Sequence, residues 1–134
     1  SAEGNRMSRL TLKSDSVEID PDRAVAIGII VNELVMNALK YAYPDGPGPI
    51  HVELHCDADD LLLSISDEGV GTNGTDKNGS DPRSTGMGQH IVSAMASKLK
   101  AGVERDPHHA GTRIVLRFSR ANPSGEGAVG NTIG

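Results

Sequence analysis

A long run of apolar residues at helical spacing, between Asp22 and Tyr43, sets the strongest constraint on the fold of this 134-residue chain. Asp20-Pro21-Asp22 has the composition of a helix start, and the proline- and glycine-rich residues 44–49 end the pattern. The spacing predicts an amphipathic helix of about six turns that must lie against an apolar layer. Its apolar residues recur with a period near 3.6, at Ile27, Ile30, Val31, Leu34, Val35, Ala38 and Ala42.

The rest of the chain predicts strands and one further helix. Helical spacing returns at Gly88–Leu99, and strand patterns occupy residues 7–13, 17–19, 50–56, 61–66, 102–105 and 112–118. Because most of these strands follow one another as hairpins, we expect an α+β fold. It would be a two-layer sandwich in which about three helices cover one face of a mixed, mostly antiparallel sheet. We expect a linker over residues 1–6, one domain over 7–118 and a flexible tail over 119–134.

Composition limits the classes of function. The aromatic residues are Tyr41, Tyr43 and Phe118, too few to form a platform on which nucleic-acid bases stack. A net charge of −5 also argues against nucleic acid or anionic lipid as partners. No run of 18 apolar residues and no signal-peptide pattern occurs, so we expect a cytoplasmic protein without direct membrane contact. The single Cys56 is expected to be a buried, unreactive thiol.

Four polar residues share one face of the predicted long helix. They stand at positions i, i+4, i+7 and i+8, within about a turn of one another: Glu33, Asn37, Lys40 and Tyr41. The Asn37 amide could bind Mg²⁺, the Lys40 ammonium could meet a phosphate, and the Glu33 carboxylate could orient or deprotonate a hydroxyl. The same residues would also suit an ordinary solvated helix face, an interpretation that an asparagine in mid-helix disfavours only slightly.

Glycines follow one predicted strand and begin the second predicted helix. In Asp67-Glu68-Gly69-Val70-Gly71, the aspartate can accept a hydrogen bond from an amine such as that of adenine, and the glycines let the backbone approach a ligand. Gly86-Met87-Gly88 begins a helix whose free N–H groups can bind an anion. Each glycine pair alone could equally be a turn or a cap. Residues 69–74 match G-x-G-x-x-G without a following helix, and no P-loop sequence occurs.

Taken in order, these segments resemble the catalytic and ATP-binding domain of two-component sensor histidine kinases. That domain belongs to a superfamily shared with gyrase, the heat-shock chaperone ATPases and the MutL-type repair ATPases. Residues 32–41 (NELVMNALKY) resemble its N box, residues 67–71 and 86–92 its two glycine boxes, and Gly111-Thr112 its last conserved segment. The resemblance covers roughly residues 10–118. It implies a Bergerat-type sandwich with a long ATP lid.

The resemblance also implies roles for individual residues. Asn37 would be the Mg²⁺ ligand, Lys40 would contact a phosphate, and Asp67 would accept a hydrogen bond from the adenine amine. The remaining contacts to ATP would come from Tyr41, Gly69, Gly71, Gly86, Met87, Gly88 and Thr112. The cofactors that it implies are therefore ATP and Mg²⁺.

Two departures from the common pattern point to a divergent branch. Many of these kinases have asparagine four residues before the metal ligand, but this chain has Glu33. A glutamate in this place recurs in the related ATPases, where it is the general base for attack by water, and in the anti-sigma-factor kinases and one branch of sensor kinases. Whether Glu33 is catalytic here stays open. The implied lid, residues 72–85, contains no phenylalanine, and one of its two cations, Lys77 or Arg83, would reach the triphosphate.

The activity implied is donation of the γ-phosphate of Mg-ATP to a histidine on a separate dimerisation and phosphoacceptor domain, with a response regulator as an indirect partner. None of the five histidines lies in a predicted long helix pair, and none stands with a carboxylate at metal-ligand spacing: His51, His55, His90, His108 and His109. The alternatives are a Ser/Thr kinase of the anti-sigma-factor type, a hydrolysing ATPase, and a binding module that has lost its affinity for ATP.

Overall fold

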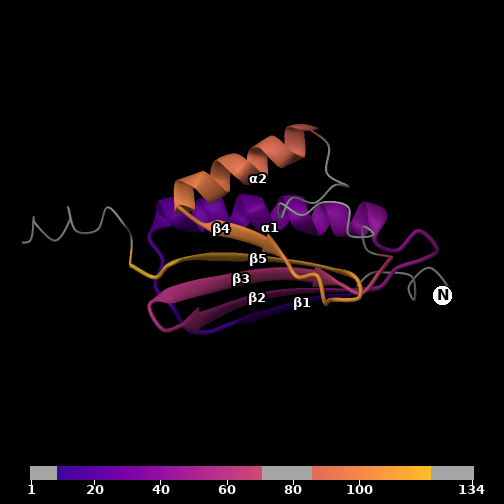
Figure 1. The fold of residues 1–134 in the computed structure, drawn as a ribbon, viewed down its shortest axis with the longest axis horizontal. Coiled ribbons are helices and arrows are strands. Elements are labelled where there is room, and N and C mark those ends of the chain that lie inside the picture. Colours follow the sequence, from indigo (N-terminus) through magenta and orange to yellow (C-terminus); the bar gives the residue numbers. More distant parts are fainter. Residues whose placement is uncertain (1–8, 71–85, 122–134) are drawn as a thin grey trace, which may run out of the picture.

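The computed structural model describes residues 9–70 and 86–121, which form a five-stranded sheet with two helices on the same side of it (Figure 1). The strands lie in the order β1-β2-β3-β5-β4; β1 and β2 run parallel, and the other neighbours run antiparallel. The predicted two-layer sandwich with a mixed, mostly antiparallel sheet is therefore confirmed, with two helices rather than three in the described residues. The elements are β1 (Arg9–Ser14), α1 (Pro21–Tyr41), β2 (Pro49–Asp57), β3 (Asp60–Asp67), α2 (Gly86–Leu99), β4 (Gly102–Arg105) and β5 (Thr112–Ser119).

The core lies between the sheet and the two helices. Side chains of a strand alternate between the two faces of a sheet, and in β5 the buried residues are the alternate ones: Thr112, Ile114, Leu116 and Phe118. They stand opposite Asp67, Ile65, Leu63 and Leu61 of β3. The helices contribute Ala26, Ile30 and Leu34 from α1, and Ala96 and Leu99 from α2. The sheet thus buries one face and leaves the other open.

The ends of α1 are fixed by local chemistry close to the predicted positions. The Asp20 carboxylate caps the helix by accepting a hydrogen bond from the Arg23 N–H at 3.3 Å, and Pro21 occupies the first turn, where its missing N–H costs nothing. At the other end, the Ala42 N–H donates to the Ala38 carbonyl, and Pro44 follows. Proline cannot donate the next helical hydrogen bond, so the helix ends before it.

The apolar character of α1 extends around the helix. Beyond its buried face it exposes Val25, Ile29, Met36 and Leu39. By length and composition alone α1 could span a membrane, although it contains no uninterrupted run of 18 apolar residues. Here it packs against α2, β2 and β3 as the core helix of the sandwich.

Two local predictions are wrong. Residues 17–19 form no strand, because the chain leaves the sheet at Asp15, whose carboxylate accepts the Cys56 N–H at 2.7 Å in the place of a further β1 residue. Val17 and Ile19 instead pack against the core. Cys56 is only partly buried at the end of β2. The predicted lid and linker, and most of the predicted tail, lie outside the described residues.

Arg23 joins the start of α1 to the end of β5. Its guanidinium is buried and donates to the main-chain carbonyls of Ser119 (2.6 Å) and Arg120 (3.3 Å). It also lies 5.4 Å from the centre of the Phe118 ring, within range of a cation–π contact. The sequence analysis did not single out this residue.

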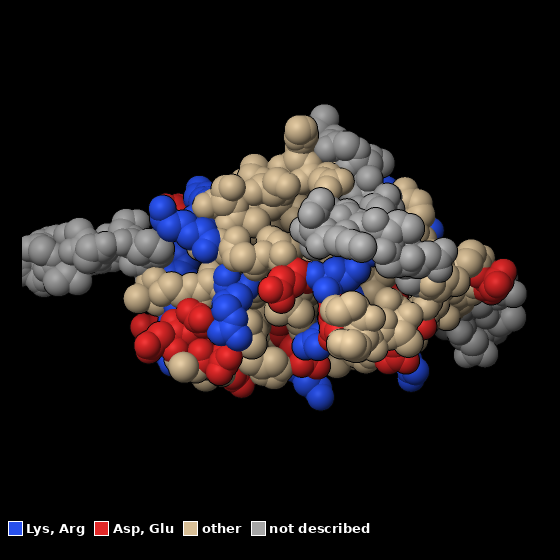
Figure 2. All heavy atoms as spheres, viewed as in Figure 1, with Lys and Arg blue, Asp and Glu red and all other residues tan. Residues whose placement is uncertain are grey.

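Charges of both signs are interspersed on the face seen in Figure 2. An acidic group lies at the left end, where Figure 1 places the β2–β3 turn, which contains Asp57, Asp59 and Asp60. The Arg117 guanidinium donates to Asp60 at 2.8 Å and to Asp57 at 3.0 Å, so ion pairs neutralise part of this group.

Candidate functional site

A buried carboxylate lies where β3 ends and β5 begins. Asp67 is the last residue of β3 and stands opposite Thr112, the first residue of β5. Asp67 is 2% exposed and Thr112 3%. The Oδ1 atom of Asp67 accepts hydrogen bonds from the N–H groups of Gly69 (3.0 Å) and Thr112 (3.3 Å). Two main-chain amides therefore orient this carboxylate.

Two buried polar atoms of predicted site residues have no hydrogen-bond partner among the described residues. They are the Nδ2 atom of Asn37, a residue 3% exposed on α1, and the Oγ1 atom of Thr112. A buried polar group without a partner is costly, and such groups in native proteins commonly serve a ligand. An asparagine amide can also turn over to present its oxygen. Both residues are therefore suited to contact a polar ligand.

The structure divides the four polar residues of α1 by burial. Asn37 is buried, Glu33 is half-buried one turn before it, and Lys40 and Tyr41 are exposed in the last turn. Helical spacing keeps all four on one side of α1. This side of α1 is therefore not simply a solvated face, because Asn37 is buried.

Close approach of main chains explains two of the glycines. A Cβ atom at Gly69 would collide with the Ala42 carbonyl, which accepts a hydrogen bond from the Val70 N–H at 2.9 Å. A Cβ atom at Gly111 would collide with the carbonyl of Asp67. These contacts bring the end of α1 and the segment before β5 against the residues that follow β3.

Two residues that sequence reasoning missed also hold this region together. The Tyr43 hydroxyl donates to the Pro49 carbonyl at 2.6 Å and accepts from the Glu68 N–H at 2.8 Å. The pKa of the Tyr43 phenol is raised, mainly because the group is removed from solvent. The hydrogen bond from the Glu68 N–H lowers this pKa, and the negative charges of Asp67 and Glu68 raise it further. The phenol therefore stays protonated at neutral pH and can donate.

The second missed residue is His109, whose Nε2 atom lies 2.8 Å from the Asp67 carbonyl oxygen and donates to it. Nothing in the sequence indicates that the segment carrying His109 reaches back to the end of β3. The sequence feature that could have pointed to this contact is the position of His109 two residues before Gly111, in the segment that resembles the last conserved segment of the family.

The structure describes only some of the other predicted site residues. The helix α2 begins at Gly86, two residues before the predicted start, and Gly88 is buried in its first turn. Gly71, Lys77 and Arg83, and the side chain of Met87, lie outside the described residues.

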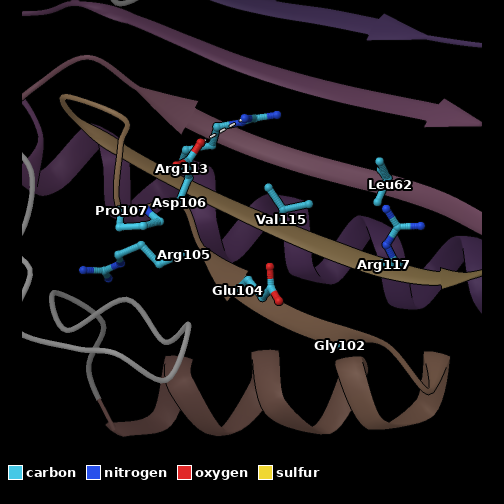
Figure 3. Close-up of a pocket in the computed structure, with 9 residues that line it drawn as sticks. All are labelled: Leu62, Gly102, Glu104, Arg105, Asp106, Pro107, Arg113, Val115 and Arg117. Atoms are coloured by element: carbon cyan, nitrogen blue, oxygen red, sulfur yellow. Dashed lines mark hydrogen bonds and ion pairs between the residues drawn. The ribbon is translucent and has the colours of Figure 1, made fainter. Parts of the chain in front are cut away.

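Of two hollows in the described part of the chain, the first shares Tyr43 and Gly69 with the region around the buried carboxylate. One, of about 370 Å³, is lined by residues 42–47 together with Gly69 and Val70. The other, of about 460 Å³, lies on the open face of the sheet, where Arg113 and Asp106 point toward each other and Val115 lies beside them (Figure 3). None of the nine residues lining this second hollow is a predicted site residue. Among residues 9–70 and 86–121, no cluster of three or more His, Cys, Asp or Glu side chains could hold a metal ion.

Comparison with known proteins gives consistent results. The family described as the histidine kinase-like ATPase domain matches residues 7–118. The chain is 29% identical over 117 residues to the sensor histidine kinase PdtaS of Mycobacterium tuberculosis, which covers 84% of this chain and 23% of PdtaS. The chain therefore spans about a quarter of the length of this curated relative.

Two solved structures share the fold. The histidine kinase domain of the blue-light activated histidine kinase EL346 from Erythrobacter litoralis matches with a TM-score of 0.74 and 19% identity, over 96% of this chain and 58% of that one. The histidine kinase AdeS of Acinetobacter baumannii matches with a TM-score of 0.64 and 22% identity, over 89% of this chain and 57% of that one.

The sequence match extends over most of the chain, from before β1 to the end of the core in β5, and the sheet order and helix placement are those of a domain found in histidine kinases. This chain belongs to the histidine kinase-like ATPase domain family.

Proposed function

We propose that this domain binds Mg-ATP and donates its γ-phosphate to a histidine on a separate dimerisation and phosphoacceptor domain. The observation that supports this most directly is the set of buried polar side chains on α1 and at the place where β3 ends and β5 begins. Asp67 is oriented by two main-chain amides, and Asn37 and Thr112 each bury a polar atom that lacks a partner among the described residues. A nucleotide offers both donors and acceptors to such a group, and the domain's family includes kinase catalytic domains.

In this proposal Asp67 and Thr112 meet the base. The charged Asp67 carboxylate accepts a hydrogen bond from the adenine amine, and the Thr112 hydroxyl, which can donate or accept, contacts the ring. Gly69 and Gly111 permit the close packing of main chains on which this geometry depends. The other nucleotide contacts implied by the resemblance remain predictions: Tyr41, Gly71, Arg83, Gly86, Met87 and Gly88.

The phosphates would lie toward the polar side of α1. Mg²⁺ bound there supplies charge neutralisation, and the Asn37 amide oxygen fits the hard oxygen ligands that this ion prefers. Lys40, exposed in the last turn of α1, and the start of α2 at Gly86 would contact phosphate oxygens. Phosphoryl transfer depends mainly on such positioning and charge stabilisation. Glu33, half-buried one turn before Asn37, would orient the acceptor or remove its proton.

The partners follow from this activity. The phosphoacceptor domain would belong to the same polypeptide or to a partner, a response regulator would receive the phosphoryl group from it, and the reaction would take place in the cytoplasm.

Acid stability of the product tests the proposal. The complete polypeptide that carries this domain would be incubated with γ-labelled ATP and Mg²⁺, and the labelled protein would then be exposed to acid and, separately, to alkali. Phosphohistidine loses its label in acid and keeps it in alkali, and this is the result we expect. An acid-stable label would indicate the Ser/Thr kinase alternative, and release of phosphate without labelled protein would indicate a hydrolysing ATPase.

A further inference from the structure

The peptide group between Asp67 and Glu68 is held at both of its polar atoms by side chains from distant parts of the chain. Its N–H, from Glu68, donates to the Tyr43 hydroxyl at 2.8 Å. Its carbonyl, from Asp67, accepts a hydrogen bond from Nε2 of His109 at 2.8 Å. One side chain follows α1 and the other precedes β5, so the plane of this peptide is fixed from two sides.

Each of the two side chains is itself anchored. The Tyr43 hydroxyl donates to the Pro49 carbonyl at 2.6 Å, and its ring lies so close to Gly48 that a Cβ atom there would overlap it. The turn that carries His109 is built around Asp106. The Asp106 carboxylate accepts from the His108 N–H at 2.9 Å and from the Arg113 guanidinium at 3.2 Å.

The peptide that is held in this way adjoins the residue whose direction matters for the proposed site. Fixing the plane of the 67–68 peptide fixes the backbone of Asp67, and with it the direction in which the carboxylate leaves the chain. The same carboxylate then receives the N–H groups of Gly69 and Thr112. A rotation of this peptide would change both the Asp67 side-chain direction and the approach of the Gly69 amide.

We propose that Tyr43 and His109 are positioning residues that direct the Asp67 carboxylate. By fixing its direction, they make the site prefer a base with an exocyclic amine over a base with a carbonyl in the same place. This inference rests on the proposed function, in which Asp67 accepts the hydrogen bond of the adenine amine. A site built to hydrogen-bond one group discriminates strongly against an analogue that lacks it, provided that its own polar groups are held in place.

A selectivity measurement separates this role from a general contribution to stability. Loss of stability alone reduces the folded fraction, and so weakens the apparent binding of every nucleotide by the same factor. The ratio of the affinities for ATP and inosine triphosphate (ITP) is independent of the folded fraction, because a smaller folded fraction lowers both affinities by the same factor. Hypoxanthine, the base of ITP, carries a carbonyl where adenine has its amine and an N–H donor at the neighbouring ring nitrogen, where adenine has an acceptor. This ratio therefore reports on the Asp67 carboxylate.

The experiment titrates the wild-type chain and its variants with Mg-ATP and with Mg-ITP. We expect Tyr43→Phe, which keeps the ring and removes the hydroxyl, and His109→Ala each to lower the preference for ATP by roughly fivefold, the effect of one lost hydrogen bond of ordinary strength. His109→Gln, whose amide can still donate to the Asp67 carbonyl, should restore most of the preference. The matched control is His108→Ala, an exposed neighbour whose hydrogen bond to Asp106 comes from its main-chain N–H.

The possible outcomes are distinct. An unchanged preference in both Tyr43→Phe and His109→Ala would overturn the inference, as would an equal loss in the His108→Ala control. If the wild type bound ATP and ITP equally, the inference would be wrong while nucleotide binding stood. If the wild type bound neither nucleotide, the proposed function itself would fail, and the inference with it.

Discussion

Arg23 and Asn37 are both buried polar residues of α1, but they differ in what they contact. The Arg23 guanidinium donates to two main-chain carbonyls at the end of β5 and lies over Phe118. The Asn37 Nδ2 atom has no partner within residues 9–70 and 86–121. Both residues interrupt an otherwise apolar buried face. The contacts of Arg23 belong to the fold alone, whereas we propose that a ligand contacts Asn37.

Substitution of Arg23 should therefore reduce stability without a specific effect on nucleotide binding. Arg23→Met keeps much of the volume but leaves the carbonyls of Ser119 and Arg120 without their donor. We expect the free energy of unfolding to fall by about 2–3 kcal/mol, the range for hydrogen bonds to a charged group. Denaturation by urea measures this change. A variant as stable as the wild type would show that these contacts contribute nothing net.

The helix α1 carries the main predictions at the scale of elements. Its cap at Asp20, its proline in the first turn and its proline-rich end could all be located in the sequence, because these signals act within a few residues of the helix ends. Within the helix, Gly28 is exposed, and glycine has the least favourable helical propensity after proline. An added Cβ atom at Gly28 would meet nothing within 4 Å.

Gly28→Ala should stabilise the domain. Alanine loses less backbone entropy than glycine when a helix forms, and no neighbour obstructs the added methyl group, so we expect a gain of about 0.5–1 kcal/mol. Thermal unfolding would show this as a higher Tm. A lower Tm would mean that this position of α1 is more crowded than its open surroundings indicate.

At the scale of the whole molecule, local patterns in the sequence were sufficient for most elements. The bounds of β4, Gly102–Arg105, match the prediction, and the β2–β3 hairpin and both helices lie within two residues of their predicted limits. These elements depend on periodicity and on turn residues, which are visible within a short window.

Features that depend on distant contacts could not be predicted in this way. The order of the strands, with β5 between β3 and β4, follows from pairing across more than 40 residues. The failure of residues 17–19 to form a strand depends on Asp15 reaching the N–H of Cys56. In the candidate site, Asn37, Asp67 and Thr112 belong to motifs that can be recognised in the sequence. Tyr43 and His109 reach the peptide group between Asp67 and Glu68 only in the folded chain.

Calorimetric titration tests whether Asn37 belongs to a site that binds Mg-ATP. The wild type, Asn37→Ala and Asn32→Ala would each be titrated with Mg-ATP; Asn32 is an exposed asparagine of the same helix and serves as the matched control. We predict that the wild type and Asn32→Ala bind one equivalent of Mg-ATP and that Asn37→Ala binds at least about tenfold more weakly. Wild-type affinity in a folded Asn37→Ala variant would contradict the account.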